Sequence, residues 1–316
     1  MTIALLALGI ALLAGGGDAL VRGAVGVARG LRVPPLIVGL TLVAFGTSTP
    51  ELVTALTAAF GGAPGIAVGN AVGASIANLL LILGLAAVMA TVVVPRAAWR
   101  RDAPTLAAAA LAALGAALWG SLDRPLGLLF VLALAAYVGW LALAGAPGGD
   151  EGMERQAREA AQATPAPPLL VSLLLLAGGV ALTVLGARLL VGAAVALAQG
   201  LGVSDAVIGL TVVALGTTLP ELAASVIAAR RGHAEVAWGN VVGSNLFNVL
   251  GILGLTAVVH PVPVPAEIAR LDVWVLLGAT LLVALLARSG HGLGRREGAV
   301  LLACYAGYVG VLAAVA

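Results

Sequence analysis

The stretch GLTLVAFGTSTPEL at residues 39–52 decides the fold of this chain, because it returns as GLTVVALGTTLPEL at residues 209–222. A second pair of matching stretches follows, GNAVGASIANLLLILGL at 69–85 and GNVVGSNLFNVLGILGL at 239–255. From 33 to 95, 30 of the 63 positions are identical to those found 170 residues later, without a gap. The chain therefore carries an internal repeat that covers 33–95 and 203–265.

The composition defines the class of protein. Hydrophobic residues make up 61% of the 316 residues and charged residues 9%, with a mean hydropathy of +1.13, which excludes a soluble globular protein. The apolar runs last about 20 residues, the length of a helix that crosses a bilayer. The strands of a membrane β-barrel would instead alternate over about ten residues. We therefore expect an all-α polytopic membrane protein.

Breaks between the apolar runs predict ten transmembrane helices in two halves of five. The first half covers 1–144 and contains the repeat 33–95, and the second covers 168–316 and contains the repeat 203–265. Between them, the polar, proline-bounded stretch 145–167 is predicted to be a linker, too short for a folded regulatory domain. The predicted spans are 3–26, 34–60, 64–92, 103–120, 125–144, 168–198, 204–229, 235–258, 272–287 and 298–315.

The arginines predict how the chain is oriented. All 16 basic residues are arginine, and 13 of them lie in or beside the loops that become cytoplasmic if the N-terminus is outside. Only Arg124, Arg188 and Arg270 fall on the other side. We expect a plasma (inner) membrane protein with both termini outside and the linker 145–167 in the cytoplasm. Because five spans separate equivalent helices, the two repeats are predicted to be inverted relative to each other.

Each copy of the first stretch carries a glutamate within an apolar segment. Glu51 and Glu221 occupy matched positions, and an ionisable group in a membrane is costly unless it faces protein or an ion. The neighbouring prolines, Pro50 and Pro220, cannot donate a backbone hydrogen bond, so the helix is expected to kink there. Carbonyl groups near position 44 and its counterpart would then join hydroxyl and carboxylate oxygens as ligands.

The second pair of stretches adds amide groups. Asn78 and Asn248 lie deep in their spans, where an amide oxygen can bind a cation, while Asn70 and Asn240 are interpreted as helix-entry or packing residues. Glycines in these stretches are interpreted as packing sites. The candidate ligands are all oxygens, without His or Cys, which favours hard cations such as Ca²⁺ and Na⁺. The glycines concerned are Gly69, Gly73, Gly239 and Gly243.

These motifs resemble the two α-repeats of the sodium/calcium exchanger family in the cation/Ca²⁺ antiporter superfamily, in particular its short prokaryotic members. The resemblance implies a central Ca²⁺ site with flanking Na⁺ sites, Na⁺/Ca²⁺ exchange by alternating access, and sliding of the first and sixth spans. It also implies that Glu51 and Glu221 bridge Ca²⁺. By motif position, the implied ligands are Ala44, Thr47, Ser48, Glu51, Asn78, Ala214, Thr217, Thr218, Glu221, Ser244 and Asn248.

Two positions depart from the family pattern. Ala74 stands where a serine is expected, although Ser244 supplies the hydroxyl in the second repeat. Both deep amide positions are Asn, where some relatives carry an Asp. Two carboxylates balance one Ca²⁺ or two Na⁺ and leave a third Na⁺ without a compensating charge. The missing Asp also argues against K⁺ co-transport.

Other functions remain open at this point. A proton-coupled antiporter for Ca²⁺ or another divalent cation would keep the same fold. Proton-coupled relatives carry Gly-Asn-x-x-Glu where this chain has Gly-Thr-Ser-x-Pro-Glu, so the resemblance implies that the hydroxyls of Thr47 and Ser48 favour Na⁺. A passive channel would need a continuous polar pore, and an enzyme would need motifs that the chain lacks. We expect no cofactor, no nucleic acid and no obligatory protein partner, so that the partners are Ca²⁺, Na⁺ and the lipid bilayer.

Overall fold

The computed structural model describes residues 2–31, 33, 35–60, 64–144, 167–200, 214–288 and 292–315. Almost all of them are helical, as the composition predicts. Eight helices in this part of the chain are long and apolar enough to cross a membrane. The predicted spans 34–60 and 204–229 are not among the eight. The first is divided into short helical pieces, and part of the second lies outside the described residues.

The first half begins with one long helix and continues with short pieces around the first repeat. Segments η1, η2, η4 and η5 are π-helical turns, in which one extra residue widens the helix. The elements of this half are α1 (Thr2–Leu31), α2 (Pro35–Val38), η1 (Gly39–Val43), α3 (Ala44–Thr47), α4 (Thr49–Phe60), α5 (Pro64–Ala77), η2 (Asn78–Ile82), α6 (Leu83–Met89), α7 (Arg96–Trp119), β1 (Ser121–Leu122) and α8 (Arg124–Ala144).

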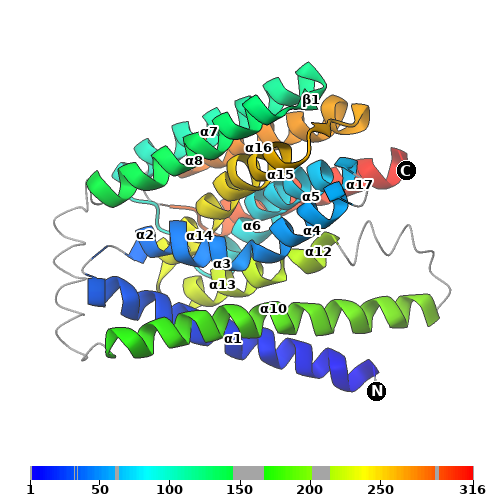
Figure 1. Ribbon diagram of the computed structural model, residues 1–316. Coiled ribbons are helices and arrows are strands. Elements are labelled where there is room, and N and C mark those ends of the chain that lie inside the picture. The colour runs from blue at the N-terminus through cyan, green and yellow to red at the C-terminus, as the bar shows by residue number, and fades with distance from the viewer. Residues whose placement is uncertain are drawn as a thin grey trace.

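The second half has a similar order of helices, but its strand precedes α16 (Val273–Ala287) instead of following it. Its elements are α10 (Leu169–Gly200), α12 (Ala214–Thr217), α13 (Leu219–Arg230), α14 (Ala234–Leu246), η4 (Phe247–Ile252), α15 (Leu253–Val259), β2 (Val262–Pro263), η5 (Ile268–Asp272), α16 (Val273–Ala287) and α17 (Arg295–Val315). In Figure 1, α1 and α10 lie side by side below the other helices, α7 and α8 lie above, and the short repeat helices lie between them. Both ends of the chain lie at the same end of the bundle, on the right of the view.

Helices α1 and α10 are antiparallel and contact each other closely along their length. Their glycines allow this approach. A Cβ on Gly16 would lie 2.8 Å from the Cβ of Leu182, and a Cβ on Gly179 would lie 2.4 Å from the backbone nitrogen of Leu20. Small residues at such a contact let two backbones approach within a membrane, where no hydrophobic force drives helices together.

The two halves cover each other reciprocally. Helix α6 packs against α17 of the second half, and its counterpart α15 packs against α8 of the first half. A Cβ on Gly84 would lie 3.2 Å from the carbonyl oxygen of Gly298, and one on Gly254 would lie 3.0 Å from that of Gly127. Strands β1 and β2 also join the halves, with Leu122 opposite Val262. Neither half therefore has a complete core of its own.

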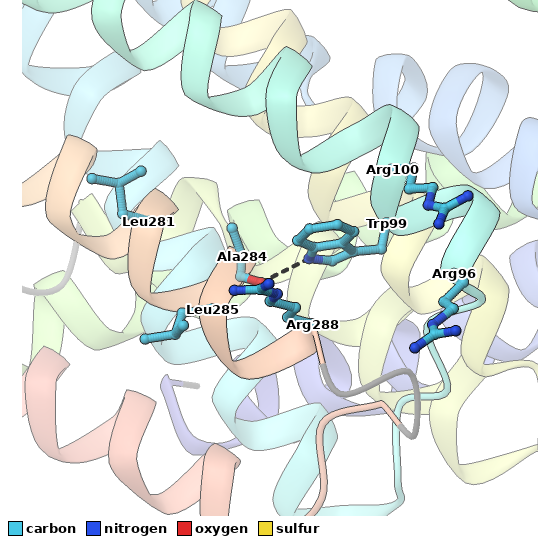
Figure 2. Close-up of a pocket in the computed structure, with 7 residues that line it drawn as sticks. All are labelled: Arg96, Trp99, Arg100, Leu281, Ala284, Leu285 and Arg288. Atoms are coloured by element: carbon cyan, nitrogen blue, oxygen red, sulfur yellow. Dashed lines mark hydrogen bonds between the residues drawn. The ribbon is translucent and has the colours of Figure 1, made fainter.

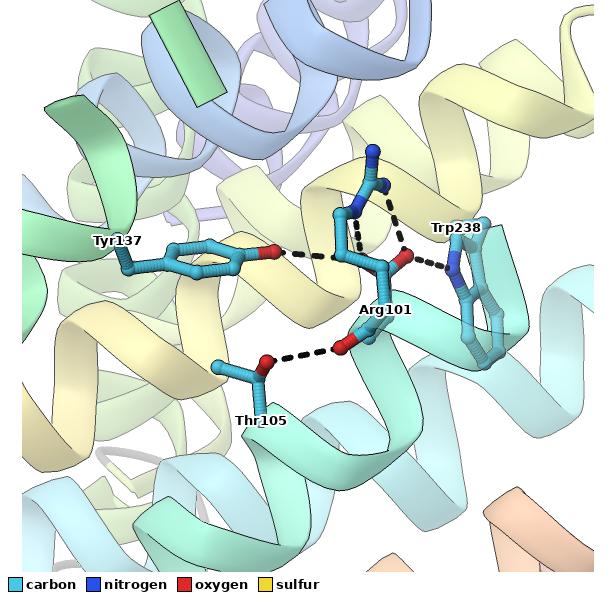
Figure 3. Close-up of polar contacts among 5 residues, drawn as sticks. Arg101, Thr105, Tyr137 and Trp238 are labelled. Carbon is cyan, nitrogen blue, oxygen red and sulfur yellow. Dashed lines mark hydrogen bonds and ion pairs between the residues drawn. The ribbon is translucent and has the colours of Figure 1, made fainter. Parts of the chain in front are cut away.

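A buried acidic residue ties α7, α8 and α14 together, and Figure 3 shows its partners Arg101, Tyr137 and Trp238 on these three helices. The carboxylate of Asp102 is fully buried. It accepts hydrogen bonds from Arg101 Nε at 2.6 Å and Nη2 at 3.1 Å, from the Tyr137 hydroxyl at 3.2 Å and from the Trp238 indole nitrogen at 2.7 Å. A buried charge is tolerated when it is paired and hydrogen-bonded in this way. Because Trp238 lies two residues before Asn240, this network holds the part of α14 that carries Asn240.

Candidate cation site

Both repeats have a helix break at the position that the prolines predict. Helix α3 ends at Thr47 and α4 begins at Thr49, while Ser48 between them has φ −84° and ψ 9°. In the second repeat, Thr218 has φ −88° and ψ 2° between α12 and α13. These angles depart from the helical values, and the proline two residues later cannot donate to the preceding turn. The breaks bring hydroxyls and carboxylates into the interior without continuous helix around them.

The Ala44 carbonyl at the first helix break was expected to be free, but it accepts hydrogen bonds within its own repeat. The Ala44 oxygen accepts the backbone N–H of Ser48 at 3.0 Å and lies 3.3 Å from Thr47 Oγ1. The same hydroxyl lies 3.1 Å from the Val43 oxygen. The Ala44 carbonyl thus takes part in the hydrogen bonding of the helix that leads to Ser48. Ala214, the counterpart of Ala44, begins α12, and its side chain lies outside the described part.

The two predicted carboxylates are buried, with Glu51 and Glu221 each 1% exposed. The hydroxyl of Ser48 donates a hydrogen bond of 2.8 Å to Glu221 Oε1, which links the two repeats directly. Within the described chain, Glu221 Oε2 and both carboxylate oxygens of Glu51 have no hydrogen-bond partner. Buried charges without a partner are unstable unless an ion or another group compensates them. Three carboxylate oxygens are therefore available to a cation.

The deep amides, Asn78 and Asn248, also have buried oxygens that lack a hydrogen-bond partner among the described residues. Asn78 is the first residue of η2 and Asn248 the second of η4, so both begin a π-helical turn. Such turns in α-helices occur frequently at functional sites. The side-chain oxygens of Asn78, Asn248 and Ser244 are buried and have no hydrogen-bond partner among the described residues.

The packing brings the carboxylates and amides of opposite repeats together. Helix α4, which carries Glu51, contacts η4 with Asn248, and α13, which carries Glu221, contacts η2 with Asn78. Helix α14 also packs against η1 and α3. A Cβ on Gly243 would lie 2.3 Å from the carbonyl oxygen of Leu40, so this glycine has the predicted packing role. Gly73 does not, since a Cβ there would have no atom within 4 Å.

The asparagines at the helix entries do more than the sequence indicates. Asn70 Nδ2 donates to the backbone carbonyl of Glu51 at 3.1 Å, and Asn240 Nδ2 lies 3.3 Å from that of Glu221. Asn240 also contacts Ser225 Oγ at 2.9 Å, and its Oδ1 lies 3.4 Å from Thr47 Oγ1. Each asparagine thus holds the backbone of a glutamate. In the sequence, the Gly-Asn dipeptide that occurs in both repeats, at 69–70 and 239–240, is the feature that could have indicated this role.

The predicted site residues form an oxygen-rich, buried group. Thr217 is partly buried, and the described ranges contain no group of three His, Cys, Asp or Glu side chains that would suit a transition metal. Carboxylate, amide and hydroxyl oxygens are the ligands of hard cations. The fully buried members are Ala44, Thr47, Ser48, Glu51, Asn78, Thr218, Glu221, Ser244 and Asn248.

Comparisons with known proteins agree with this fold. The family model described as "Sodium/calcium exchanger protein" matches residues 1–143 and 171–314. The chain is 38% identical over 303 residues to the putative antiporter CaxA of Alkalimonas amylolytica, covering 95% of each protein. It is 33% identical over 340 residues to the sodium/calcium exchanger MaX1 of Methanosarcina acetivorans, covering 98% of this chain and 97% of the relative.

A solved structure extends the similarity to three dimensions. The sodium-calcium exchanger NCX_Mj, soaked with Na⁺ and Ca²⁺, superposes with a TM-score of 0.84 at 31% identity, covering 98% of this chain and 97% of that protein. These findings define a polytopic helical membrane transporter. The chain belongs to the sodium/calcium exchanger family, and with it to the Ca²⁺ antiporters.

Proposed function

We propose that this protein exchanges Na⁺ for Ca²⁺ across the plasma membrane by alternating access to the site between the repeats. The observation that carries the proposal is the pair of buried carboxylates, Glu51 and Glu221, with three oxygens that lack a protein donor. Hydroxyl and amide oxygens from both repeats surround them. The proposed ligands are the eleven residues named from the sequence, and the transported ions are the substrates.

The charge of the site gives a physical reason for exchange. Two carboxylates are neutralised by one Ca²⁺ or by two Na⁺, and the electrostatic cost of binding both together in a buried site is high. The two kinds of ion would therefore compete for the same oxygens. Ser48 favours Na⁺ over a proton as the counter-ion, because its hydroxyl oxygen can bind a metal ion while it donates to Glu221. Ala74 leaves one hydroxyl fewer for Na⁺.

The architecture supports the proposal of ten spans in two inverted repeats. The reciprocal contacts α6 with α17 and α8 with α15 are those that a two-fold axis in the membrane plane would produce. The pieces at 35–60 would form one broken span and those at 214–230 part of its counterpart. With the arginine distribution, this arrangement favours both termini outside and the linker 145–167 in the cytoplasm.

Access to the site would switch by movement of α1 and α10 as one unit. The two helices contact each other closely, and both also contact α13. Their mutual contact is formed largely through glycines such as Gly16 and Gly179, so they can move together without separating. A buried site that opens to one side at a time would follow from such a shift.

Radioactive Ca²⁺ uptake into proteoliposomes that contain the purified protein tests this function. Vesicles loaded with Na⁺ are compared with vesicles loaded with choline and with vesicles under an imposed pH gradient. We expect uptake only when internal Na⁺ is present. Uptake that follows the pH gradient alone would assign the protein to proton-coupled antiporters, and flux without any gradient of counter-ion would indicate a channel.

A further inference from the structure

A hollow of about 490 Å³ opens between the start of α7 and the end of α16, and none of the candidate cation ligands lines it (Figure 2). Three arginines line it, Arg96 and Arg100 from α7 and Arg288 from the end of α16. Trp99 lies between them, and its indole nitrogen donates to the backbone oxygen of Ala284 at 2.7 Å. This bond joins the two helices at the hollow and fixes the indole ring.

The three arginines are available to a ligand. Their side chains are exposed, and none forms an ion pair or a side-chain hydrogen bond within the described ranges. The adjacent Arg101 differs, because its guanidinium is engaged by Asp102. No acidic residue lines the hollow. Three positive charges therefore line one hollow without compensation, which suits a phosphate group because guanidinium groups bind phosphate oxygens in pairs.

The hollow is amphipathic along the helix axis. Leu285 and Leu281 line it about one turn and two turns before Arg288, and these residues are 64% and 52% exposed. Exposed leucines on a membrane-spanning helix face lipid, while arginine and tryptophan at its end lie at the level of the headgroups. The hollow therefore has a charged end formed by the arginines and an apolar wall formed by the leucines, which an acyl chain can contact.

From this geometry we propose that the hollow binds one anionic phospholipid. The phosphate group contacts the guanidinium groups of Arg96, Arg100 and Arg288, and an acyl chain lies along Leu281 and Leu285. Basic pockets between transmembrane helices are suited to anionic headgroups. An inorganic phosphate would satisfy the arginines but leave the leucine wall unused.

The internal repeat supplies a comparison within the same molecule. Residues 170 positions away occupy the equivalent place in the other half, and there the arginines are largely replaced by alanine or leucine. The hollow is thus not a by-product of the duplicated framework, since only one of its two copies is basic. The equivalents of Arg96, Trp99 and Arg100 are Ala266, Ala269 and Arg270, and those of Leu281, Leu285 and Arg288 are Leu111, Gly115 and Leu118.

Native mass spectrometry of the purified full-length protein tests the proposal. Dioleoyl-phosphatidylglycerol and dioleoyl-phosphatidylcholine are offered at equal concentration to the natural chain and to two triple variants. The first variant combines R96Q, R100Q and R288Q. The matched control combines R230Q, R295Q and R296Q, which removes the same charge from exposed arginines outside the hollow.

We expect the natural protein and the control to retain phosphatidylglycerol preferentially, and the first variant to retain roughly tenfold less of it, as the loss of several charge-assisted contacts implies. An excess of inorganic phosphate should not displace the lipid. Equal retention of both lipids by the natural chain would overturn the proposal without any variant. An equal loss in the control, or displacement by inorganic phosphate at the concentration of the lipid, would also overturn it.

Discussion

The two glutamate motifs have nearly the same sequence and the same helix break, but they differ in how their carboxylates are held. Glu221 accepts a hydrogen bond from Ser48 of the other repeat, while neither carboxylate oxygen of Glu51 has a hydrogen-bond partner in the described chain. The reciprocal position to Ser48 is Thr218, which is also buried. The repeat therefore supplies a symmetric framework, and the distribution of hydroxyls makes the site asymmetric.

The two asparagines that hydrogen-bond to the backbone of the glutamates differ in the same way. Asn240 contacts the Glu221 carbonyl, Ser225 and Thr47, and it is fully buried. Asn70 makes one contact, to the Glu51 carbonyl, and is only partly buried. Position 55, which corresponds to Ser225, is alanine. The second repeat is thus the more rigid side of the site, and the first repeat carries the carboxylate that depends most on an ion.

The strongest test of this comparison removes each negative charge in turn. We expect E51Q and E221Q each to lower Na⁺-dependent Ca²⁺ uptake at least about 100-fold, since a buried divalent cation then lacks half of its compensating charge. Flux measurements in proteoliposomes provide the values. The exposed Glu267 supplies the control, because E267Q should transport like the natural protein. Activity near that of the natural protein in either site variant would refute the pairing of the two carboxylates.

The next effect concerns the two supporting asparagines. N240A should lower the free energy of unfolding by about 2–3 kcal/mol and N70A by about 1 kcal/mol, because the first leaves more buried polar groups without partners. Thermal unfolding of the purified variants in detergent shows which variant loses more stability. Equal losses in the two variants would show that the second repeat is not the more rigid side.

Removing the hydroxyl that links the repeats should have a smaller effect. We expect S48A to raise the Ca²⁺ concentration for half-maximal uptake about tenfold, because one hydrogen bond to a charged group contributes about 1.5 kcal/mol. The neighbouring Thr49 is the matched control. Its hydroxyl donates to the carbonyl of Phe45 and the residue is exposed, so T49A should leave uptake unchanged. If S48A showed the Ca²⁺ dependence of the natural protein, the hydrogen bond from Ser48 to Glu221 would not contribute to Ca²⁺ binding.

The smallest effect restores the missing hydroxyl. A74S should reduce the internal Na⁺ concentration needed for half-maximal Ca²⁺ uptake by about 2–3-fold, because one more neutral oxygen faces the Na⁺ sites. S244A should shift it in the opposite direction. Counter-ion titrations at fixed Ca²⁺ measure both shifts. If A74S and S244A moved the Na⁺ dependence in the same direction, positions 74 and 244 would not serve equivalent Na⁺ sites.

Local sequence features predicted the positions of the helix breaks, since Pro50 and Pro220 act on their own turn of helix. They also predicted that Glu51 and Glu221 are buried, because the surrounding segments are apolar. The prediction failed where the outcome depends on partners far away in the chain. The contacts of Asn240 with Thr47 and Ser225, and the π-helical turns that begin at the deep amides, result from packing between repeats. The hydrogen bonds that the Ala44 carbonyl accepts from Ser48 and Thr47 were also not foreseen, because they depend on where the helix breaks.

The reciprocal cover of the two halves has a consequence for the synthesis of the protein. Helix α6 packs against α17, which leaves the ribosome more than 200 residues after α6. Gly84 on α6 meets Gly298 and Leu302 of that helix, so its packing surface has no native partner until α17 has been synthesised. Helix α8 likewise has to wait for α15. The first half is thus inserted into the membrane before it can fold, and a chain that stops before α17 leaves α6 exposed to quality-control proteases.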